Sequence, residues 1–216
     1  HTYLYLSAAG KIDESIKRQC ESKIDVQKLD NYIKNYSKRF IKNKKSCGKI
    51  TKRFLGAYNY MGYKEFDETL PALTKNITYL NDKYNIVSPI FLKKLSDEAL
   101  EKGYEVFEFY SPLSVQVLEH IAIPELDISF TISEKYKNRR CINCHRFLKE
   151  ELNYHNRLKF LSKIKAELLN EAEIKLTEIK KLHDDLEKNY IPSMNFINIE
   201  KLSKEYILKV TEKLLI

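Results

Sequence analysis

The sequence predicts an α/β fold: a mostly parallel sheet with flanking helices and long helical segments at both ends. The stretch 83–111 has the pattern of a strand, a sharp turn, a helix and a second strand. Such a unit places its two strands parallel, joined by a right-handed crossover. At both ends of the chain, apolar residues recur every three or four residues, which is typical of amphipathic helices.

The composition is that of a globular protein. The 216 residues are 43% hydrophobic and 31% charged, which is sufficient for a sizeable core. The net charge is +8, but the lysines are dispersed among glutamates, so we expect a solvated surface and no specific nucleic-acid partner. No apolar run approaches the ~18 residues of a membrane span, so we expect no membrane partner. The absence of a signal-peptide pattern and the uneven spacing of the four cysteines predict a cytoplasmic location with reduced thiols.

The first segment, from Leu4 to about Phe40, is expected to form one long helix or a helical hairpin. Its apolar residues follow helical spacing, regularly at first and less regularly after Ile24. Asp25 is placed to cap a second helical segment that begins at Val26.

The middle of the chain alternates strand and helix signals. We expect strands at 49–58, 77–87, 104–110 and within 121–132. Short helices are expected before Leu70-Pro71 and over 115–120. Between the second and third strands, 89–102 has an amphipathic helical pattern, and Gly103 follows it as a residue type favoured just after a helix.

The tail is expected to form a long helix over 147–190, ended by Pro192, and a final helix over 198–216. One apolar stripe along the long helix predicts either packing on the α/β core or a dimeric coiled coil. Lys165 and Lys175 interrupt strict heptads, which favours packing on the core.

Several short stretches carry a family resemblance. They are YLYLSAAGKIDESI near the start, FLGAY from Phe54, FLKKLSDEALEKGYEV from Phe91, SPLSVQVLEHIAIPELDISFTIS from Ser111 and KKLHDDLEKNYIPSMNF from Lys180. Together they resemble a bacterial family of tandem P-loop NTPase-like proteins described as ATPases, and they cover nearly all of the chain.

The resemblance implies a domain organisation and a set of ligands. Residues 1–46 would be a helical segment closing a preceding half, 47–146 a P-loop NTPase-like α/β core, and 147–216 a long-helix segment packing on that core. The family's ligands would be ATP and Mg²⁺. The partner would be an upstream ATPase half or, alternatively, a second copy in a homo-oligomer.

The turn that opens the central helix departs from the family. The family carries G-x-x-x-x-G-K-[ST] there, a loop whose backbone N–H groups, lysine and hydroxyl hold phosphate and Mg²⁺. Here Ser88 stands at the position of the lysine and Pro89 at that of the hydroxyl. The glycines are absent, which predicts a degenerate Walker A loop that is shortened as well as altered. The strand over 126–132 has Asp127 at its start and Ser133 at its end, so it lacks a terminal carboxylate for Mg²⁺.

The sequence therefore predicts a protein that is non-catalytic by itself and needs no cofactor as an isolated chain. Ser88, Lys93 and Lys94 are the candidate remnants of the phosphate loop. The alternative interpretation of the two lysines is an ordinary solvated helix surface. A helical interaction or scaffold protein is the alternative function.

Two further groups of residues need an interpretation. Cys141, Cys144 and His145 match the C-x-x-C-H haem-attachment pattern, and with His145 or His155 they also offer a zinc site, or they are chance surface residues. Glu119 and His120 are adjacent in the expected helix 115–120. Neighbours on a helix point to different faces, so we do not expect them to form an acid–base couple.

Overall fold

The computed structural model describes residues 2–149 and 155–214. It divides the chain into two compact units, His1–Lys175 and Leu176–Ile216. The first unit holds the sheet together with the helices that precede it, so the segment 1–46 and the α/β core lie in the same unit. The second unit holds the end of one long helix and the final helix.

The core of the first unit is a six-stranded sheet in the order β1-β5-β6-β7-β4-β8. The strands are β1 (Lys49–Phe54), β4 (Asn76–Asn81), β5 (Glu105–Tyr110), β6 (Leu118–Ile123), β7 (Ile128–Thr131) and β8 (Arg140–Asn143). Within the described chain, β6 is antiparallel to both of its neighbours, while the other pairings are parallel. The predicted α/β class with a mostly parallel sheet is confirmed.

The expected strand 49–58 is wrong in its extent, because the chain bends at Leu55. Beyond the bend, β2 (Gly56–Asn59) pairs with β3 (Gly62–Glu65) as a separate antiparallel hairpin. Gly62 has a φ of +82°, which only glycine adopts without strain. The short helix expected to end near Leu70-Pro71 is wrong in its position, because α3 spans Thr69–Leu73 and so begins where that helix was expected to end.

The expected helix 115–120 is also wrong, because this segment leads into strand β6. The strand expected within 121–132, after the Pro124 turn, is β7, and it follows a turn in which Asp127 has a φ of +52°. Strand β6, which precedes this turn, was not expected. Burial explains the error, since β6 is covered on both faces and has no apolar–polar alternation to mark it as a strand.

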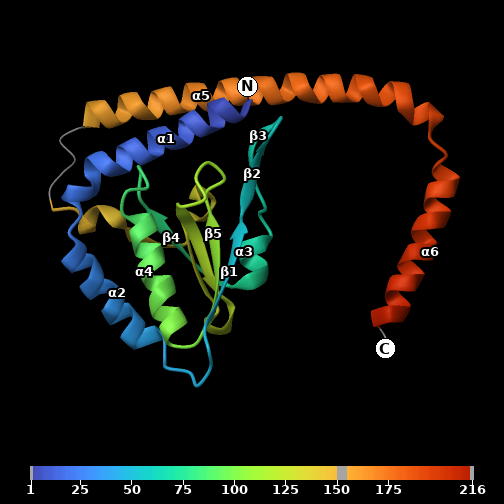
Figure 1. Ribbon diagram of the computed structural model, residues 1–216. Helices are drawn as coiled ribbons and strands as arrows, with labels where there is room; N and C mark the ends of the chain where they lie inside the picture. The colour runs from blue at the N-terminus through green and yellow to red at the C-terminus, as the bar shows by residue number, and fades with distance from the viewer. Residues whose placement is uncertain (1, 150–154, 215–216) are drawn as a thin grey trace. The chain divides into compact units, whose positions relative to one another are not determined.

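Helices cover both faces of the sheet (Figure 1). On one face, α4 (Ser88–Glu101) packs on β5 and β6, and α2 (Val26–Phe40) packs on α4, around a large apolar core. On the other face, α3 contributes Leu70 to a smaller cluster. Asp25 caps α2 through a hydrogen bond from the Lys28 N–H, and Gly103 follows α4 with a φ of +87°, as the sequence predicts.

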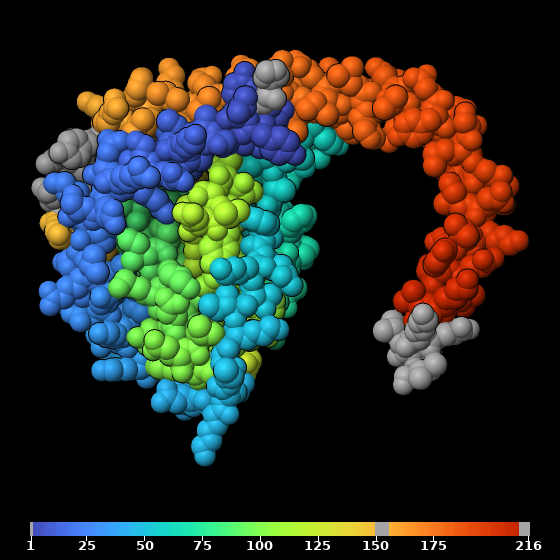
Figure 2. Space-filling model, in the orientation of Figure 1, coloured from blue at the N-terminus to red at the C-terminus, as the bar shows by residue number. Residues whose placement is uncertain are grey.

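Two helices lie across the end of the sheet at which the parallel strands finish. They are α1 (Thr2–Cys20) and the first part of α5 (His155–Tyr190). Figure 2 shows them side by side, and an ion pair of 2.6 Å joins Lys165 of α5 to Asp13 of α1. Leu158, Leu161 and Ala172 of α5 are buried, so this part of α5 packs within the first unit.

The second unit contains the end of α5 and the final helix, α6 (Phe196–Leu214). The long helix was expected from residue 147, but a short 3₁₀ turn, Cys144–Phe147, occupies that position, and residues 150–154 lie outside the described part. Many apolar side chains of this unit are exposed, including Leu182 at 70% and Ile197 at 80%. No helix in the described ranges has the length and apolar character needed to cross a membrane.

Candidate functional site

The loop that joins β4 to α4 has the full length of a phosphate loop. It occupies residues 82–87, because β4 ends at Asn81 and α4 begins at Ser88. With Ser88 at the lysine position, the two glycines of G-x-x-x-x-G-K-[ST] fall on Asp82 and Val87. The six residues between the strand and the helix equal the six that precede the lysine in the motif, so the expectation of a shortened loop is wrong.

Asp82 occupies the anion position of this loop. Its carboxylate oxygen Oδ2 accepts hydrogen bonds of 2.7 Å from the backbone N–H groups of both Val87 and Ser88. Its carbonyl accepts another from the N–H of Asn85, whose φ of +50° turns the chain back toward the helix. The N-terminus of α4 is thus bound by a carboxylate from its own chain.

The electrostatics of the helix end favour this arrangement. The first N–H groups of a helix have no partner within the helix, and the helix dipole adds a partial positive charge there. A bound phosphate satisfies such a site in nucleotide-binding proteins. Here the Asp82 carboxylate supplies the negative charge, so an incoming phosphate would compete with a group that is held permanently at the site.

The space around Asp82 is also closed. The cavity between the loop and the segment that follows β8 has a volume of about 10 Å³ and is lined by Asp82, Val87, Cys144 and Leu148, among others. A cavity of this size is at the lower limit for a single water molecule. A phosphate group does not fit there unless the segment after β8 moves.

Ser88 and Pro89 do not provide the lysine and the hydroxyl that the motif G-x-x-x-x-G-K-[ST] has at these two positions. Ser88 is fully buried, and its hydroxyl has no hydrogen-bond partner within the described structure. Pro89 has no N–H to donate and is itself buried in the first turn of α4. Neither side chain therefore supplies the positive charge or the metal-binding hydroxyl of a working phosphate loop.

Lys93 is held by two carboxylates. Its Nζ lies 2.9 Å from Asp97 on the same helix and 3.2 Å from the fully buried Glu108 of β5. Burial alone would raise the pKa of Glu108, but hydrogen bonds from Tyr110, Ser96 and Lys93 lower this pKa below its ordinary value. Lys93 therefore balances a buried charge between α4 and the sheet.

Lys94 makes a different ion pair. Its Nζ lies 2.6 Å from Asp30, so it joins α4 to α2. Of the three candidate remnants, only Ser88 lies in the loop region itself. Among the described residues, neither lysine contacts the loop: Lys94 pairs with Asp30 at the helix surface, whereas Lys93 pairs with the buried Glu108 and so differs from an ordinary solvated lysine.

A larger cavity lies beside the loop, next to Ile86 and Ile90, and has a volume of about 340 Å³. Its charged lining residues are Glu14, Lys17, Arg18 and Glu21, all from α1 and the turn that follows it. Two acidic and two basic groups cancel, so this cavity has no net charge to attract a nucleotide phosphate.

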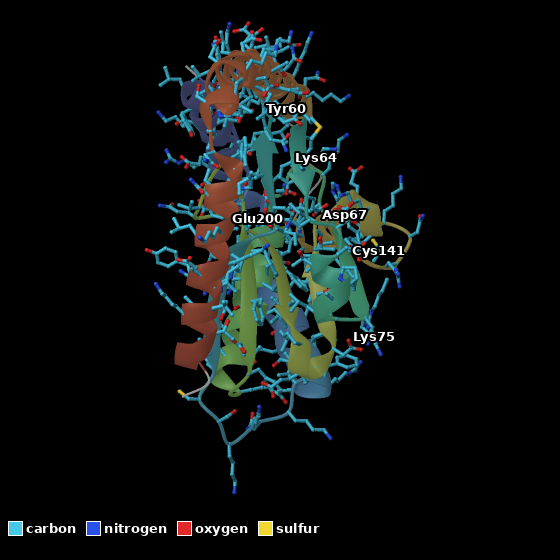
Figure 3. All side chains as sticks on the ribbon, turned by 90° about the vertical axis from the view of Figure 1, so that its right-hand side faces the viewer. Tyr60, Lys64, Asp67, Lys75, Cys141 and Glu200 are labelled. Carbon is cyan, nitrogen blue, oxygen red and sulfur yellow. The ribbon has the colours of Figure 1, made fainter. Side chains whose placement is uncertain are left out.

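The structure does not bring Cys141, Cys144 and His145 together as ligands. Cys141 (labelled in Figure 3) is exposed on the edge strand β8, whereas Cys144 is buried and His145 is exposed on the following turn. Burial, and next the nearby Asp82 charge, raise the pKa of the Cys144 thiol, which disfavours the thiolate that a metal requires. Among the described side chains, the cluster with converging metal-ligand atoms is instead His183, Asp184 and Glu187 on exposed turns of α5.

The sequence interpretation missed two sets of residues. Asp82 was overlooked, although counting back from Ser88 along the motif places it at the first glycine. Glu119 and His120 were assigned to a helix; on β6, the Nε2 atom of His120 instead lies 3.9 Å from the Glu119 carboxylate. They line a cavity at the same end of the sheet.

The fold and the loop together define an α/β domain in which the N-terminus of α4 binds the Asp82 carboxylate of the same chain. Comparison of the chain with protein-family models, curated proteins and solved structures finds no match.

Proposed function

We propose that this chain is a P-loop NTPase-like domain whose phosphate loop is closed by its own carboxylate, and that its role is structural and non-catalytic. The observation that carries the proposal is the pair of hydrogen bonds from the Val87 and Ser88 N–H groups to Asp82. A strand, a loop of the motif's length and a helix support the P-loop-like assignment, together with the sequence resemblance.

The substitutions support the loss of catalysis. The lysine that would neutralise phosphate is replaced by a buried Ser88, and the hydroxyl that would bind Mg²⁺ is replaced by Pro89. As the resemblance implies, the partner of such a domain is an ATPase half, which this domain would support. The bound nucleotide and Mg²⁺ would then belong to the partner half.

Calorimetric titration with Mg-ATP tests this proposal. The unaltered chain is expected to give no saturable binding. A variant that rebuilds the motif, with Asp82→Gly, Val87→Gly, Ser88→Lys and Pro89→Ser, is expected to gain measurable affinity. Micromolar binding and turnover of Mg-ATP by the unaltered chain would refute the closed-loop proposal. A rebuilt variant that folds but does not bind Mg-ATP would refute the P-loop-like assignment.

A single substitution tests the closed loop with less disturbance. Asp82→Ala frees the two N–H groups and the space that the carboxylate occupies, so inorganic phosphate should shift the amide NMR signals of Val87 and Ser88 in this variant only. Asp25→Ala is the matched control, because Asp25 caps α2 through one N–H at an exposed site. Equal phosphate shifts in the unaltered chain would show that Asp82 does not block the site.

A second candidate, self-association through the second unit, is favoured by the exposed apolar side chains of that unit. On α5, Ile179, Leu182 and Leu186 are 53%, 70% and 59% exposed, at the three- and four-residue spacing of a coiled-coil seam. From Leu176 to Ile216, seven lysines are balanced by seven acidic residues, so net charge does not oppose the approach of a second copy. Light scattering should then report a dimer, and a monomer after Leu182→Glu with Leu186→Glu. A monomeric unaltered chain at high concentration would exclude this candidate.

A further inference from the structure

A cavity of about 330 Å³ lies where β5 and β7 end, away from the β4–α4 loop. Five segments contribute to its wall: the β2–β3 hairpin, the loop after β5, the start of β6, the turn after β7, and α5. Its polar and aromatic lining residues are Tyr58, Tyr63, Glu65, Ser111, Glu119, His120, Ser133, Glu134, Lys135 and Lys165.

The charges around this cavity are unbalanced toward the negative side. Both lysines already have acidic partners, since Lys165 lies 2.6 Å from Asp13 and Lys135 pairs with Asp67 and, at 3.4 Å, with Glu65. Glu119 has no lysine or arginine within ion-pair distance among the described residues. An acidic cavity in a chain of net charge +8 is a local reversal of sign, which attracts a cation.

The pKa of the Glu119 carboxyl is shifted by its burial and by the charges around the cavity. Burial raises its pKa to about 7, and the Asp13 and Glu65 charges add to the rise, against a hydrogen bond from Ser111 and the charge of Lys165. The other titratable groups that line the cavity are His120, Glu134, Lys135, Tyr58 and Tyr63. A cation bound beside Glu119 would favour its ionised form.

His120 provides an independent sign of a missing ligand. Its side chain is 4% exposed, and its Nε2 atom has no hydrogen-bond partner among the residues that the structure describes. Its Nδ1 atom lies 2.6 Å from the Thr131 hydroxyl, which already accepts a hydrogen bond from the Ser133 N–H. Among the described residues, Nδ1 is the acceptor within reach of the Thr131 hydroxyl proton, so this hydroxyl donates to Nδ1 and the neutral ring carries its proton on Nε2.

The Nε2–H group is thus a buried donor of a residue that lines the cavity. Less than 1 Å² of the Nε2 atom is accessible, so a ligand reaches it after a small rotation of the ring toward the cavity. The Nε2 atom lies 3.9 Å from the nearest Glu119 oxygen, which is too far for a hydrogen bond. A buried donor without an acceptor is unfavourable, so an oxygen atom of a ligand placed there would relieve it.

From these contacts we infer that the cavity binds a small organic ammonium compound that carries a neutral oxygen, such as an amino alcohol. The ammonium group lies among Glu119, Glu65 and the faces of Tyr58 and Tyr63, and the oxygen accepts from the Nε2–H of His120. A metal ion fits less well, because among the described side chains the ligand atoms that converge closely are on α5, at His183, Asp184 and Glu187.

NMR titration of the full chain with ethanolamine, ethylamine and ethylene glycol, in an amine-free buffer, tests this inference. Ethanolamine should saturate the signals of His120 and Ser133 with a dissociation constant on the order of millimolar, given its small size. Ethylamine should bind several-fold more weakly because it lacks the oxygen, and ethylene glycol should not bind. Absence of saturable binding by both amines, or equal binding by the glycol, would overturn the inference.

The dependence on pH and on Glu119 gives a second test. Since ionised Glu119 favours the cation, the ethanolamine affinity should fall about tenfold from pH 8 to pH 6. Glu119→Gln should remove both this dependence and at least about nine-tenths of the affinity at pH 8. Glu105→Gln is the matched control, because it removes the same charge from a partly exposed site at the opposite end of β5, beside Lys49. A Glu119→Gln variant that binds ethanolamine like the unaltered chain would refute the assignment.

Discussion

The two polar regions at the end of the sheet differ in how their charges are matched. In the β4–α4 loop, the Asp82 carboxylate is bound by two backbone N–H groups of the helix that it caps. In the cavity at β5 and β7, Glu119 lies near other carboxylates, and the Nε2–H of His120 has no acceptor in the part of the chain that the structure describes. The polar groups of the loop are hydrogen-bonded to one another, whereas the cavity contains a carboxyl group and a ring N–H whose interactions are incomplete among the described residues.

This difference indicates where a ligand has something to contribute. A phosphate at the loop would have to displace Asp82 and enlarge a cavity whose volume is now only about 10 Å³. A cation at the cavity would enter a space of about 330 Å³ and match charges that are already present. A position at the carboxyl ends of parallel strands is thus not sufficient evidence of a nucleotide site; the state of the polar groups decides which ligand is favoured.

The largest expected effect concerns Glu119 and pH. The folded protein retains the Glu119 proton up to about pH 7, whereas the unfolded chain releases it near pH 4.5. Between these values the unfolded state binds fewer protons, so this group makes the free energy of unfolding fall as pH rises. Glu119→Gln should therefore raise the free energy of unfolding above pH 7 by about 3 kcal/mol, at 1.36 kcal/mol per pKa unit.

Urea denaturation from pH 4 to pH 8 measures this effect, and His120 makes it easier to recognise. Burial lowers the pKa of His120 from 6.5 to about 3, so its contribution to the free energy of unfolding rises with pH between these values. In the unaltered chain the two trends oppose each other over about pH 4.5–6.5. In Glu119→Gln only the rise should remain, and an unchanged pH profile would contradict the assigned burial of Glu119.

The next largest effect is expected at Asp82. Asp82→Ala leaves the N–H groups of the buried Val87 and Ser88 without acceptors, which should lower the free energy of unfolding by about 2 kcal/mol. Asp25→Ala, which removes one bond at an exposed cap, should cost about 1 kcal/mol. Chemical denaturation of both variants gives the comparison. If Asp82→Ala costs less than Asp25→Ala, the loop is not held by the carboxylate.

The features that the sequence predicted correctly are local. The cap at Asp25, the helix α4 and the stop at Gly103 depend on side chains and backbone groups within a few residues of one another. Strand β6 was missed because its burial on both faces comes from elements distant in the sequence. Local patterns therefore predicted the class and helix α4. The strand expected over 77–87 is wrong in its extent, because β4 ends at Asn81 and a loop follows it, and no local pattern predicted the order of the strands.

The two polar regions show the same limit. The role of Asp82 depends on a loop conformation that returns the N–H groups of Val87 and Ser88 to a side chain five and six residues earlier. The cavity depends on residues as far apart as Tyr58 and Lys165. Neither arrangement follows from periodicity or motif spacing, because both require the folded backbone.

A smaller effect, of opposite sign, is expected at Ser88. Its buried hydroxyl has no partner in the described structure, so Ser88→Ala should raise the free energy of unfolding by about 0.5–1 kcal/mol. Thermal denaturation should show a higher melting temperature than that of the unaltered chain. Ser96→Ala is the control, because the Ser96 hydroxyl donates to Glu108 at 2.7 Å and its loss should be destabilising. Destabilisation by both variants would mean that Ser88 is hydrogen-bonded after all.

The smallest effect concerns Lys94, and it separates the two interpretations of that residue. Its ion pair with Asp30 is partly exposed, with side chains 36% and 34% accessible, so Asp30→Ala should lower the free energy of unfolding by less than about 0.5 kcal/mol. If Lys94 were a remnant of the phosphate loop, releasing it from Asp30 in an Asp82→Ala background would strengthen phosphate binding. We expect the phosphate affinity of the double variant, measured by NMR titration, to equal that of Asp82→Ala alone. Only the backbone of the loop would then contact the anion, as the hydrogen bonds of Val87 and Ser88 to Asp82 predict.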